Sequence, residues 1–248
     1  MKELASQSWL IYRDAEERGI QALVRPSIPI LFFGDHERYF ASPLRIITVG
    51  LNPSRVEFPQ SDRFARFPAA RGIDPSAPAL DLYLRSLRDY FRERPYDAWF
   101  KPAFEELLRG LGASYYDGAE STALHTDICT PLATDPTWSR LKEQHAALAA
   151  GGGELWHNLV ERLEPHVILI SVARQHLDTI RFRKLGAWTT VHTVERANPF
   201  SVQAVAIEVT SAKETLLVFG RAANLPFGTV SGAHKRTIGE AIRRAVNA

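Results

Sequence analysis

Residues 46–58 read IITVGLNPSRVEF, a buried-strand pattern that breaks at Gly50 into an Asn-Pro turn. In an α/β protein, a strand that stops abruptly at a glycine usually opens a crevice at the carboxyl end of the sheet, where ligands bind. An isolated Asn-Pro pair is also an ordinary turn. The rest of the chain has to decide between a binding crevice and a plain turn.

Helical and strand patterns alternate along the remaining sequence. Apolar spacing predicts helices at 3–24, 79–94, 102–112, 154–165, 173–181 and 237–246. Apolar and β-branched runs predict strands at 44–49, 121–134, 166–172, 188–194, 202–209 and 215–220, and 28–33 fits either a short strand or an extended arm. The alternation predicts one α/β domain over 1–248, a three-layer α/β/α sandwich with a central, largely parallel sheet, on which residues 1–43 pack as a helix and an arm.

Cysteine content and apolar runs constrain the compartment. The 248 residues include one cysteine, Cys129, which excludes an internal disulfide and any cysteine-rich metal site. We expect Cys129 to be a buried thiol in a cytoplasmic protein, because no apolar run approaches membrane length and the acidic N-terminal stretch does not fit a signal peptide. The histidines show no ligand spacing, and phosphate-loop, dinucleotide, serine-elbow and zinc-protease motifs are missing. The sequence therefore predicts no metal and no cofactor.

Two regions concentrate basic side chains although the formal net charge is only +2. Residues 216–248 contain five basic residues (lysine or arginine) and one acidic residue, Glu240. This excess of positive charge fits a phosphate-contacting surface or the solvated face of a terminal helix. In 53–78, arginines 55, 63, 66 and 71 alternate with phenylalanines 58, 64 and 67 among five prolines. This second segment is too long and too aromatic for an idle connection.

The order of these features resembles the uracil-DNA glycosylase superfamily. The motif Gly50-Leu51-Asn52-Pro53-Ser54 looks most like the first motif of its single-strand-selective and mismatch-specific branches, and a long aromatic loop follows it. The resemblance covers the element order from residue 44 to the end, and only the first motif is a close local match. It implies a monofunctional DNA glycosylase that flips a base out of DNA and leaves an abasic site, with DNA as its partner.

The chemistry of base hydrolysis assigns roles to the first motif. The reaction passes through an oxocarbenium-like state, so the site needs an aligned water. The carbonyl oxygen of Asn52 can accept a hydrogen bond from that water, and the resemblance implies this role. Backbone N–H groups of the turn, which includes Gly50, Leu51, Pro53 and Ser54, are expected at the base or the adjacent phosphate. A stacking phenylalanine about a dozen residues beyond the motif in the family nominates Phe64, then Phe67, although either can equally be a core residue.

The second motif, 125–132, departs from the family, which presents a base-reading asparagine there. Asp127 is the nearest candidate. An ionised carboxylate only accepts hydrogen bonds, so it suits the exocyclic amine of cytosine better than the carbonyl groups of uracil. The substrate is therefore expected to be uracil or a modified pyrimidine, including modified cytosine of phage DNA in an antiviral role. A capping or ion-paired Asp127 is the structural alternative.

The last motif departs further from the family pattern. The loop contains Asn224-Leu225-Pro226-Phe227 as a loose echo, with His234 ten residues beyond Asn224. We expect His234 either to stabilise the leaving base or to contact phosphate, and Leu225 or Phe227 to enter the duplex as a wedge. The other predicted DNA contacts are Arg221, Lys235 and Arg236. A plain surface loop is the alternative.

Two rival functions stay open at this point. The first is a non-catalytic binder of DNA or nucleotides that keeps the pocket without the base-reading asparagine. The second is hydrolysis of free nucleosides or nucleotides, against which salt-dependent binding to oligonucleotides would count.

Overall fold

The computed structural model describes residues 1–141, 144–211 and 213–246. The chain divides into two compact units, each built from three segments. Unit 1 comprises Met1–Asp35, Gly50–Tyr96 and His125–Arg162, and unit 2 comprises His36–Val49, Asp97–Leu124 and Leu163–Ala248. The single domain expected from the sequence stays a prediction, and each unit is described by itself.

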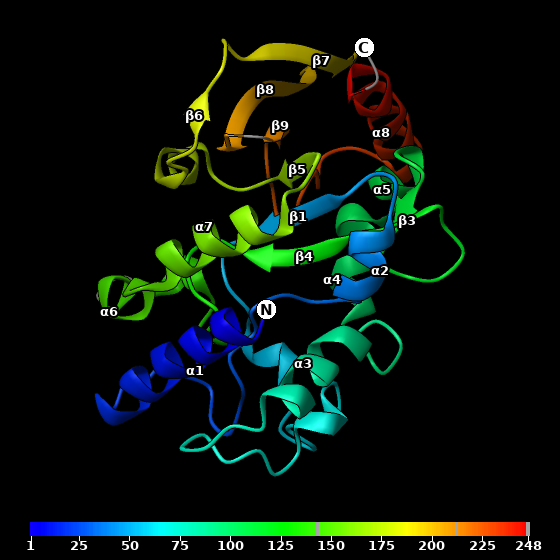
Figure 1. The fold of residues 1–248 in the computed structure, drawn as a ribbon. Coiled ribbons are helices and arrows are strands. Elements are labelled where there is room, and N and C mark those ends of the chain that lie inside the picture. The colour runs from blue at the N-terminus through cyan, green and yellow to red at the C-terminus, as the bar shows by residue number, and fades with distance from the viewer. Residues whose placement is uncertain (142–143, 212, 247–248) are drawn as a thin grey trace. The chain divides into compact units, whose positions relative to one another are not determined.

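Unit 2 is built on a mixed sheet (Figure 1). Strands β1 (Ile46–Gly50), β5 (Val167–Ile170) and β9 (Lys213–Gly220) are parallel, with Ile47 opposite Ile168 and Ile168 opposite Leu217. Their near-continuous apolar sequences are typical of strands buried on both faces. Beyond β9 the sheet turns antiparallel through β8 (Phe200–Thr210), which pairs with β7 (Thr189–Val194) and β6 (Arg183–Lys184). The protein is thus α/β, and the parallel part of the predicted sheet is confirmed only for β1, β5 and β9.

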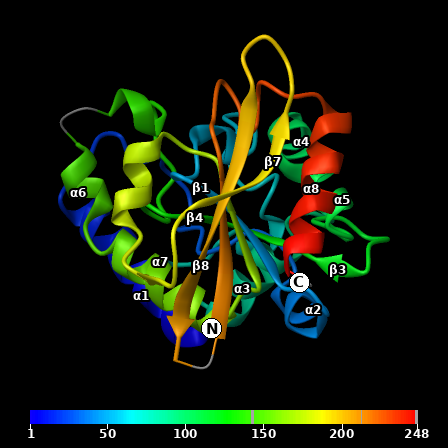
Figure 2. The same ribbon diagram turned by 90° about the horizontal axis from the view of Figure 1, so that it is seen from above.

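Two helices of unit 2 cross at glycines. Helix α5 (Glu106–Gly110) packs against α8 (Gly232–Val246), and the two lie side by side in Figure 2. A Cβ atom on Gly110 would lie 2.1 Å from the carbonyl oxygen of Arg236, and one on Gly239 would lie 2.1 Å from that of Leu107. The missing side chains therefore allow the two backbones to touch. The rest of unit 2 includes α2 (His36–Ala41), α4 (Asp97–Phe100), a π-helical turn (Lys101–Glu105), a 3-10 helix (Arg174–Thr179) and the parallel pair β2 (Ala113–Ser114) and β3 (Ser121–Thr122).

Unit 1 is largely helical and rich in buried aromatic side chains. Its elements are α1 (Lys2–Glu17), α3 (Leu80–Asp89), α6 (His145–Ala149), α7 (Gly152–Leu163), most of β4 (Leu124–Asp127) and 3-10 turns at Arg55–Glu57, Pro68–Ala70 and Trp138–Arg140. Trp9 of α1 packs edge-on against Tyr12 and against Tyr83 of α3. The Tyr83 hydroxyl lies 3.1 Å from the Ser8 hydroxyl, so the buried phenol keeps a hydrogen-bond partner.

The structure corrects several predicted elements and decides between the two alternatives for residues 28–33. The first helix ends at Glu17 rather than at residue 24, because Gly19 adopts a left-handed φ of 63° and the N–H of Ile20 donates back to the carbonyl oxygen of Ala15. Residues 28–33 form the extended arm, with a bridge from Phe33 to His125. The helix expected at 102–112 is interrupted by the π turn, since Pro102 supplies no N–H to an α-helical ladder. The helix expected at 154–165 begins two residues earlier, since α7 starts at Gly152.

Membrane-spanning helices and metal-ligand clusters are both absent from the described residues, 1–141, 144–211 and 213–246. None of the helices in these ranges combines the length and the apolar character that a membrane crossing needs. The same ranges contain no group of three or more histidine, cysteine or acidic side chains placed to hold a metal ion.

Candidate active site

The side-chain amide of Asn52 is held in one orientation. Its Nδ2 atom donates hydrogen bonds to the carbonyl oxygens of Pro53 (2.6 Å) and Leu132 (3.3 Å) and to the Thr134 hydroxyl (2.8 Å). Carbonyl oxygens only accept, so the nitrogen must face them and Oδ1 must face away. Within the residues described, Oδ1 receives no hydrogen bond, and the half-buried side chain retains one free acceptor.

The first and second predicted motifs are hydrogen-bonded to each other in unit 1. Backbone N–H groups of Ile128 and Cys129 donate to the carbonyls of Gly50 (3.1 Å) and Leu51 (2.9 Å). Farther along, the N–H of Thr134 donates to Pro53 (3.1 Å). Ser54 caps the following 3-10 turn by accepting from the N–H of Val56. These hydrogen bonds hold the backbone of the turn after β1 in one conformation.

Gly50 is needed because the second motif approaches its α-carbon. A Cβ atom on Gly50 would lie 2.5 Å from Oδ1 of Asp127 and 3.0 Å from Nε2 of His125. Both side chains are almost fully buried, and Nε2 of His125 lies 3.7 Å from Oδ1 of Asp127. The ion-paired alternative for Asp127 matches this geometry when His125 is protonated. The same geometry also places a carboxylate against the backbone of the first motif.

A second buried carboxyl group lies in the same unit. Glu57 accepts a hydrogen bond of 2.6 Å from the Tyr90 hydroxyl, and its Oε2 lies 3.9 Å from Nε of Arg66. Burial raises the pKa of Glu57 to about 7 despite these two favourable partners. Glu57 can therefore take up or release a proton near neutral pH. The one sign of Glu57 in the sequence is that an acidic residue stands between the apolar neighbours Val56 and Phe58.

The two stacking candidates occupy different environments. Phe67 is fully buried, with its ring 5.3 Å from Phe58 in a stacked arrangement and 5.2 Å from Tyr90. Phe64 is half-buried and touches Phe58 edge-on at 6.4 Å. Phe67 is thus a core residue, the alternative already open for it, and Phe64 is the ring with an exposed surface.

Cys129 is a half-buried free thiol. Burial, with a smaller contribution from Asp127, raises its pKa to about 12. The thiolate that would act as a nucleophile is therefore scarce at neutral pH, and Cys129 has no place in the proposed chemistry.

In unit 2 the loop after β9 is anchored by Phe227. This side chain is fully buried between Phe104 and Phe200, and its N–H donates to the Ser171 hydroxyl at 2.9 Å. A Cβ atom on Gly220 would lie 2.1 Å from the Phe227 ring. Phe227 consequently cannot serve as a wedge while this packing persists. Leu225 is half-exposed and remains available.

Lys235 also differs from its predicted role. Its Nζ is buried and donates to the carbonyl oxygens of Pro102, Ala103 (3.0 Å) and Pro226 (3.2 Å). Burial lowers its pKa to about 8, so the amine is still mostly charged at neutral pH. Lys235 therefore ties the 221–231 loop to the π turn and offers no donor to a DNA phosphate.

The other predicted contacts of this loop lie at the surface. Arg221, Asn224 and His234 are exposed, and Pro226 is buried. His234 occupies the first turn of α8, where its N–H donates to the Ser231 hydroxyl. Arg236 is exposed and pairs with Glu106 at 2.9 Å. Arg221, Asn224, Leu225 and His234 therefore keep the exposure that a DNA contact needs.

Comparisons with protein-family models, with curated proteins and with solved structures find no match to this chain.

Proposed function

We propose that the chain is a monofunctional DNA glycosylase with the α/β/α fold of the uracil-DNA glycosylase superfamily. The carrying observation is the orientation of Asn52, whose Nδ2 is held by three acceptors while Oδ1 stays free. Oδ1 accepts a hydrogen bond from one water molecule and directs its oxygen at the anomeric carbon. The N-glycosidic bond breaks and the base leaves as an anion with the bonding electrons. The water oxygen bonds to the anomeric carbon, and the proton that the water loses is taken up by the departing base.

Asp127 supports a cytosine-type base as the substrate. Its carboxylate is almost fully buried and lies against Gly50, at the start of the turn that carries Asn52. An ionised carboxylate accepts from an exocyclic amine and repels a carbonyl oxygen. The expected substrate is therefore a modified cytosine rather than uracil. The half-exposed ring of Phe64 provides the stacking surface for the flipped base.

DNA contact is assigned to the exposed residues of unit 2. His234, Arg221, Asn224 and Arg236 are candidates for phosphate contact. Leu225 is the candidate wedge. Lys235 and Phe227 are left out of this set because both are buried.

The test is base release from oligonucleotides that contain uracil, modified cytosines or mismatches, followed by alkali cleavage of abasic sites. Asn52→Ala should abolish release, and Asn198→Ala, at an exposed asparagine with no assigned role, should retain most of it. Thr134→Val removes one acceptor of the Asn52 amide, and we expect kcat to fall about tenfold with KM little changed, because the water loses its alignment. Thr134→Ser should restore the rate. Alkali-dependent breaks that do not depend on Asn52 would refute the proposal.

A non-catalytic binder of DNA is the second candidate, favoured by one observation. Asp127 lies 3.7 Å from His125 and occupies the place of the family's base-reading asparagine. In that case no oligonucleotide would release a base. Asn52→Ala would also leave DNA affinity unchanged.

A further inference from the structure

A cavity of about 550 Å³ in unit 1 has a strongly basic lining. Four arginines line it, Arg25, Arg55, Arg63 and Arg66, and among the described residues Asp135 is the only carboxylate in the lining. Neither Asn52 nor Asp127 is part of the lining. Sites for small molecules typically have this size. The cavity is therefore distinct from the Asn52 turn and is suited to an anionic ligand.

Two of the arginines are held in place by neutral partners. Arg63 donates to the carbonyl oxygen of Phe58 at 2.7 Å, and Arg66 donates to that of Val56 at 3.1 Å. The guanidinium of Arg66 also lies 5.4 Å from the centre of the Tyr96 ring. A guanidinium carries five N–H donors, so these contacts orient the groups and leave donors for a ligand. Carbonyl partners do not cancel the charge.

The nearby carboxyl groups compensate the arginines only weakly. Asp135 lies 3.5 Å from Arg55, and both side chains are more than half exposed, where such pairs are weak. Glu57 lies 3.9 Å from Arg66, but its burial raises its pKa to about 7, so near neutral pH much of it is uncharged. An anion in the cavity would therefore meet several uncompensated guanidinium groups.

The remaining lining fits an organic group attached to that anion. Val56 contributes half-buried apolar surface, and the exposed Gln21 and Gln60 contribute amides. The cavity is also lined by Leu23, Val24 and Phe58, which are almost or fully buried. Apolar surface accommodates a base or a sugar, and an amide can pair with the edge of a base through both a donor and an acceptor. Inorganic phosphate would use only the arginines.

We propose that this cavity is a nucleotide-binding site, with the phosphate held by the arginines and the nucleoside against the apolar wall and the glutamines. The nucleotide belongs either to a DNA strand or to a free mononucleotide. The site goes beyond the proposed glycosylase activity, because binding in it needs neither Asn52 nor cleavage of a glycosidic bond.

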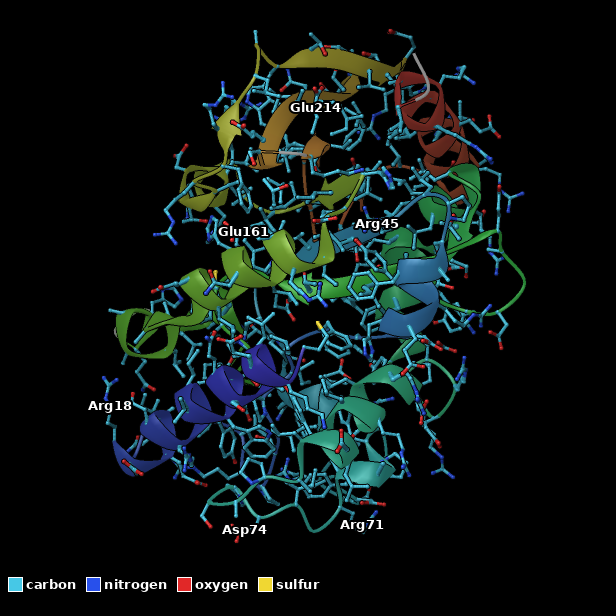
Figure 3. The ribbon with its side chains drawn as sticks, in the orientation of Figure 1. Arg18, Arg45, Arg71, Asp74, Glu161 and Glu214 are labelled. Atoms are coloured by element: carbon cyan, nitrogen blue, oxygen red, sulfur yellow. The ribbon has the colours of Figure 1, made fainter. Side chains whose placement is uncertain are left out.

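The test is calorimetric titration of the whole chain with thymidine 5′-monophosphate, thymidine, inorganic phosphate and a short oligothymidylate. The test variant Arg25→Gln/Arg55→Gln removes two cavity arginines. The control variant Arg18→Gln/Arg71→Gln removes two arginines that pair with Asp14 and Asp62 and do not line the cavity. Arg18 and Arg71 are labelled in Figure 3. We expect the test variant to bind nucleotides at least about tenfold more weakly, because charge-assisted bonds to phosphate are lost. The control should bind within about twofold of the parent, since only its general charge changes.

Each outcome decides the proposal. Stronger binding of the oligonucleotide than of the mononucleotide, per nucleotide, assigns the site to a DNA strand, and equal binding assigns it to free nucleotides. Equal weakening in the two double variants would overturn the site, as would binding of thymidine or phosphate as tight as that of the nucleotide. Gln60→Glu adds a carboxylate to the cavity and should weaken nucleotide binding similarly. It replaces Arg25→Gln/Arg55→Gln as the test variant if that double variant folds poorly. Asn52→Ala should leave nucleotide binding in the cavity intact. A failure of the nucleotide-site proposal can therefore be told apart from a failure of the glycosylase proposal.

Discussion

Oδ1 of Asp127 lies 2.5 Å from the position that a Cβ atom on Gly50 would occupy. Real side-chain carbons do not approach an oxygen so closely, so any residue other than glycine would displace the carboxylate or the turn. The glycine at the end of β1 is therefore explained by the approach of the second motif. The crevice expected after Gly50 stays a prediction.

Gly50→Ala should lower the free energy of unfolding by roughly 1–3 kcal/mol through this overlap, and should abolish base release because Asp127 moves. Denaturant unfolding and the alkali assay measure the two effects. Gly153→Ala is the matched control, since the nearest atom to a Cβ atom there is the Ile128 carbonyl oxygen at 4.0 Å. In a double-mutant cycle, Asp127→Ala should relieve about 1 kcal/mol or more of the Gly50→Ala cost. Strictly additive effects would contradict the contact.

The strands of the core were predictable because their signal is local. The apolar runs that form β1, β5 and β9 each lie within a single stretch of sequence. Because these strands are buried on both faces, their sequences are continuously apolar and are recognised without a partner strand. The antiparallel half of the sheet had a signal that the prediction of a largely parallel sheet did not use. Only residues 210–214 separate the expected strands 202–209 and 215–220, too few for the crossover that parallel neighbours need. The break in the 102–112 helix had one signal, Pro102.

Much of the candidate site depends on contacts between distant residues. Asn52 and Thr134 are 82 positions apart, Glu57 and Tyr90 are 33 apart, and Lys235 and Pro102 are 133 apart. No spacing rule links such pairs. Residue type indicated that Asn52 could orient water, but only the three acceptors fix which atom faces away. For the same reason Lys235, a basic residue in a basic segment, was predicted to contact DNA, whereas the structure buries it.

Glu57 should make the stability of the protein depend on pH. Its folded pKa of about 7 lies above the ordinary value of 4.5, so between these values the folded state binds more protons than the unfolded state. The associated stability is fully present below the unfolded pKa and is lost as pH rises through about 7. Relative to Glu57→Gln, the parent should lose roughly 2 kcal/mol of unfolding free energy between about pH 5 and about pH 8.

Denaturant unfolding of both proteins at the two pH values gives this difference directly. The groups around Glu57 are Tyr90, Arg66 and Asp127. Glu93→Gln is the control, because Glu93 is exposed and should leave the slope with pH unchanged. A parent and a Glu57→Gln variant with parallel pH profiles would show that Glu57 is ionised throughout.

Lys235 should contribute to stability rather than to DNA affinity. Lys235→Met keeps most of the volume but leaves the carbonyls of Pro102, Ala103 and Pro226 without their shared donor. We expect a loss of roughly 2–4 kcal/mol in unfolding free energy. The neighbouring Arg236→Gln, at an exposed ion pair, should cost under about 1 kcal/mol. A stable Lys235→Met protein with weakened DNA binding would reverse the assignment.

Substitutions at Leu225 and Phe227 should have different effects, because Leu225 is the candidate wedge that enters the duplex and Phe227 is a buried side chain that anchors the loop. Phe227→Ala empties a space bounded by Phe104, Phe200 and Gly220, and should cost roughly 3–5 kcal/mol of unfolding free energy. Leu225→Ala should leave thermal unfolding nearly unchanged, because Leu225 is half-exposed. A wedge compensates for the lost stacking in a duplex, so Leu225→Ala should slow base release from double-stranded DNA and spare single-stranded DNA. Equal slowing on both substrates would mean that Leu225 contacts the strand without entering the stack.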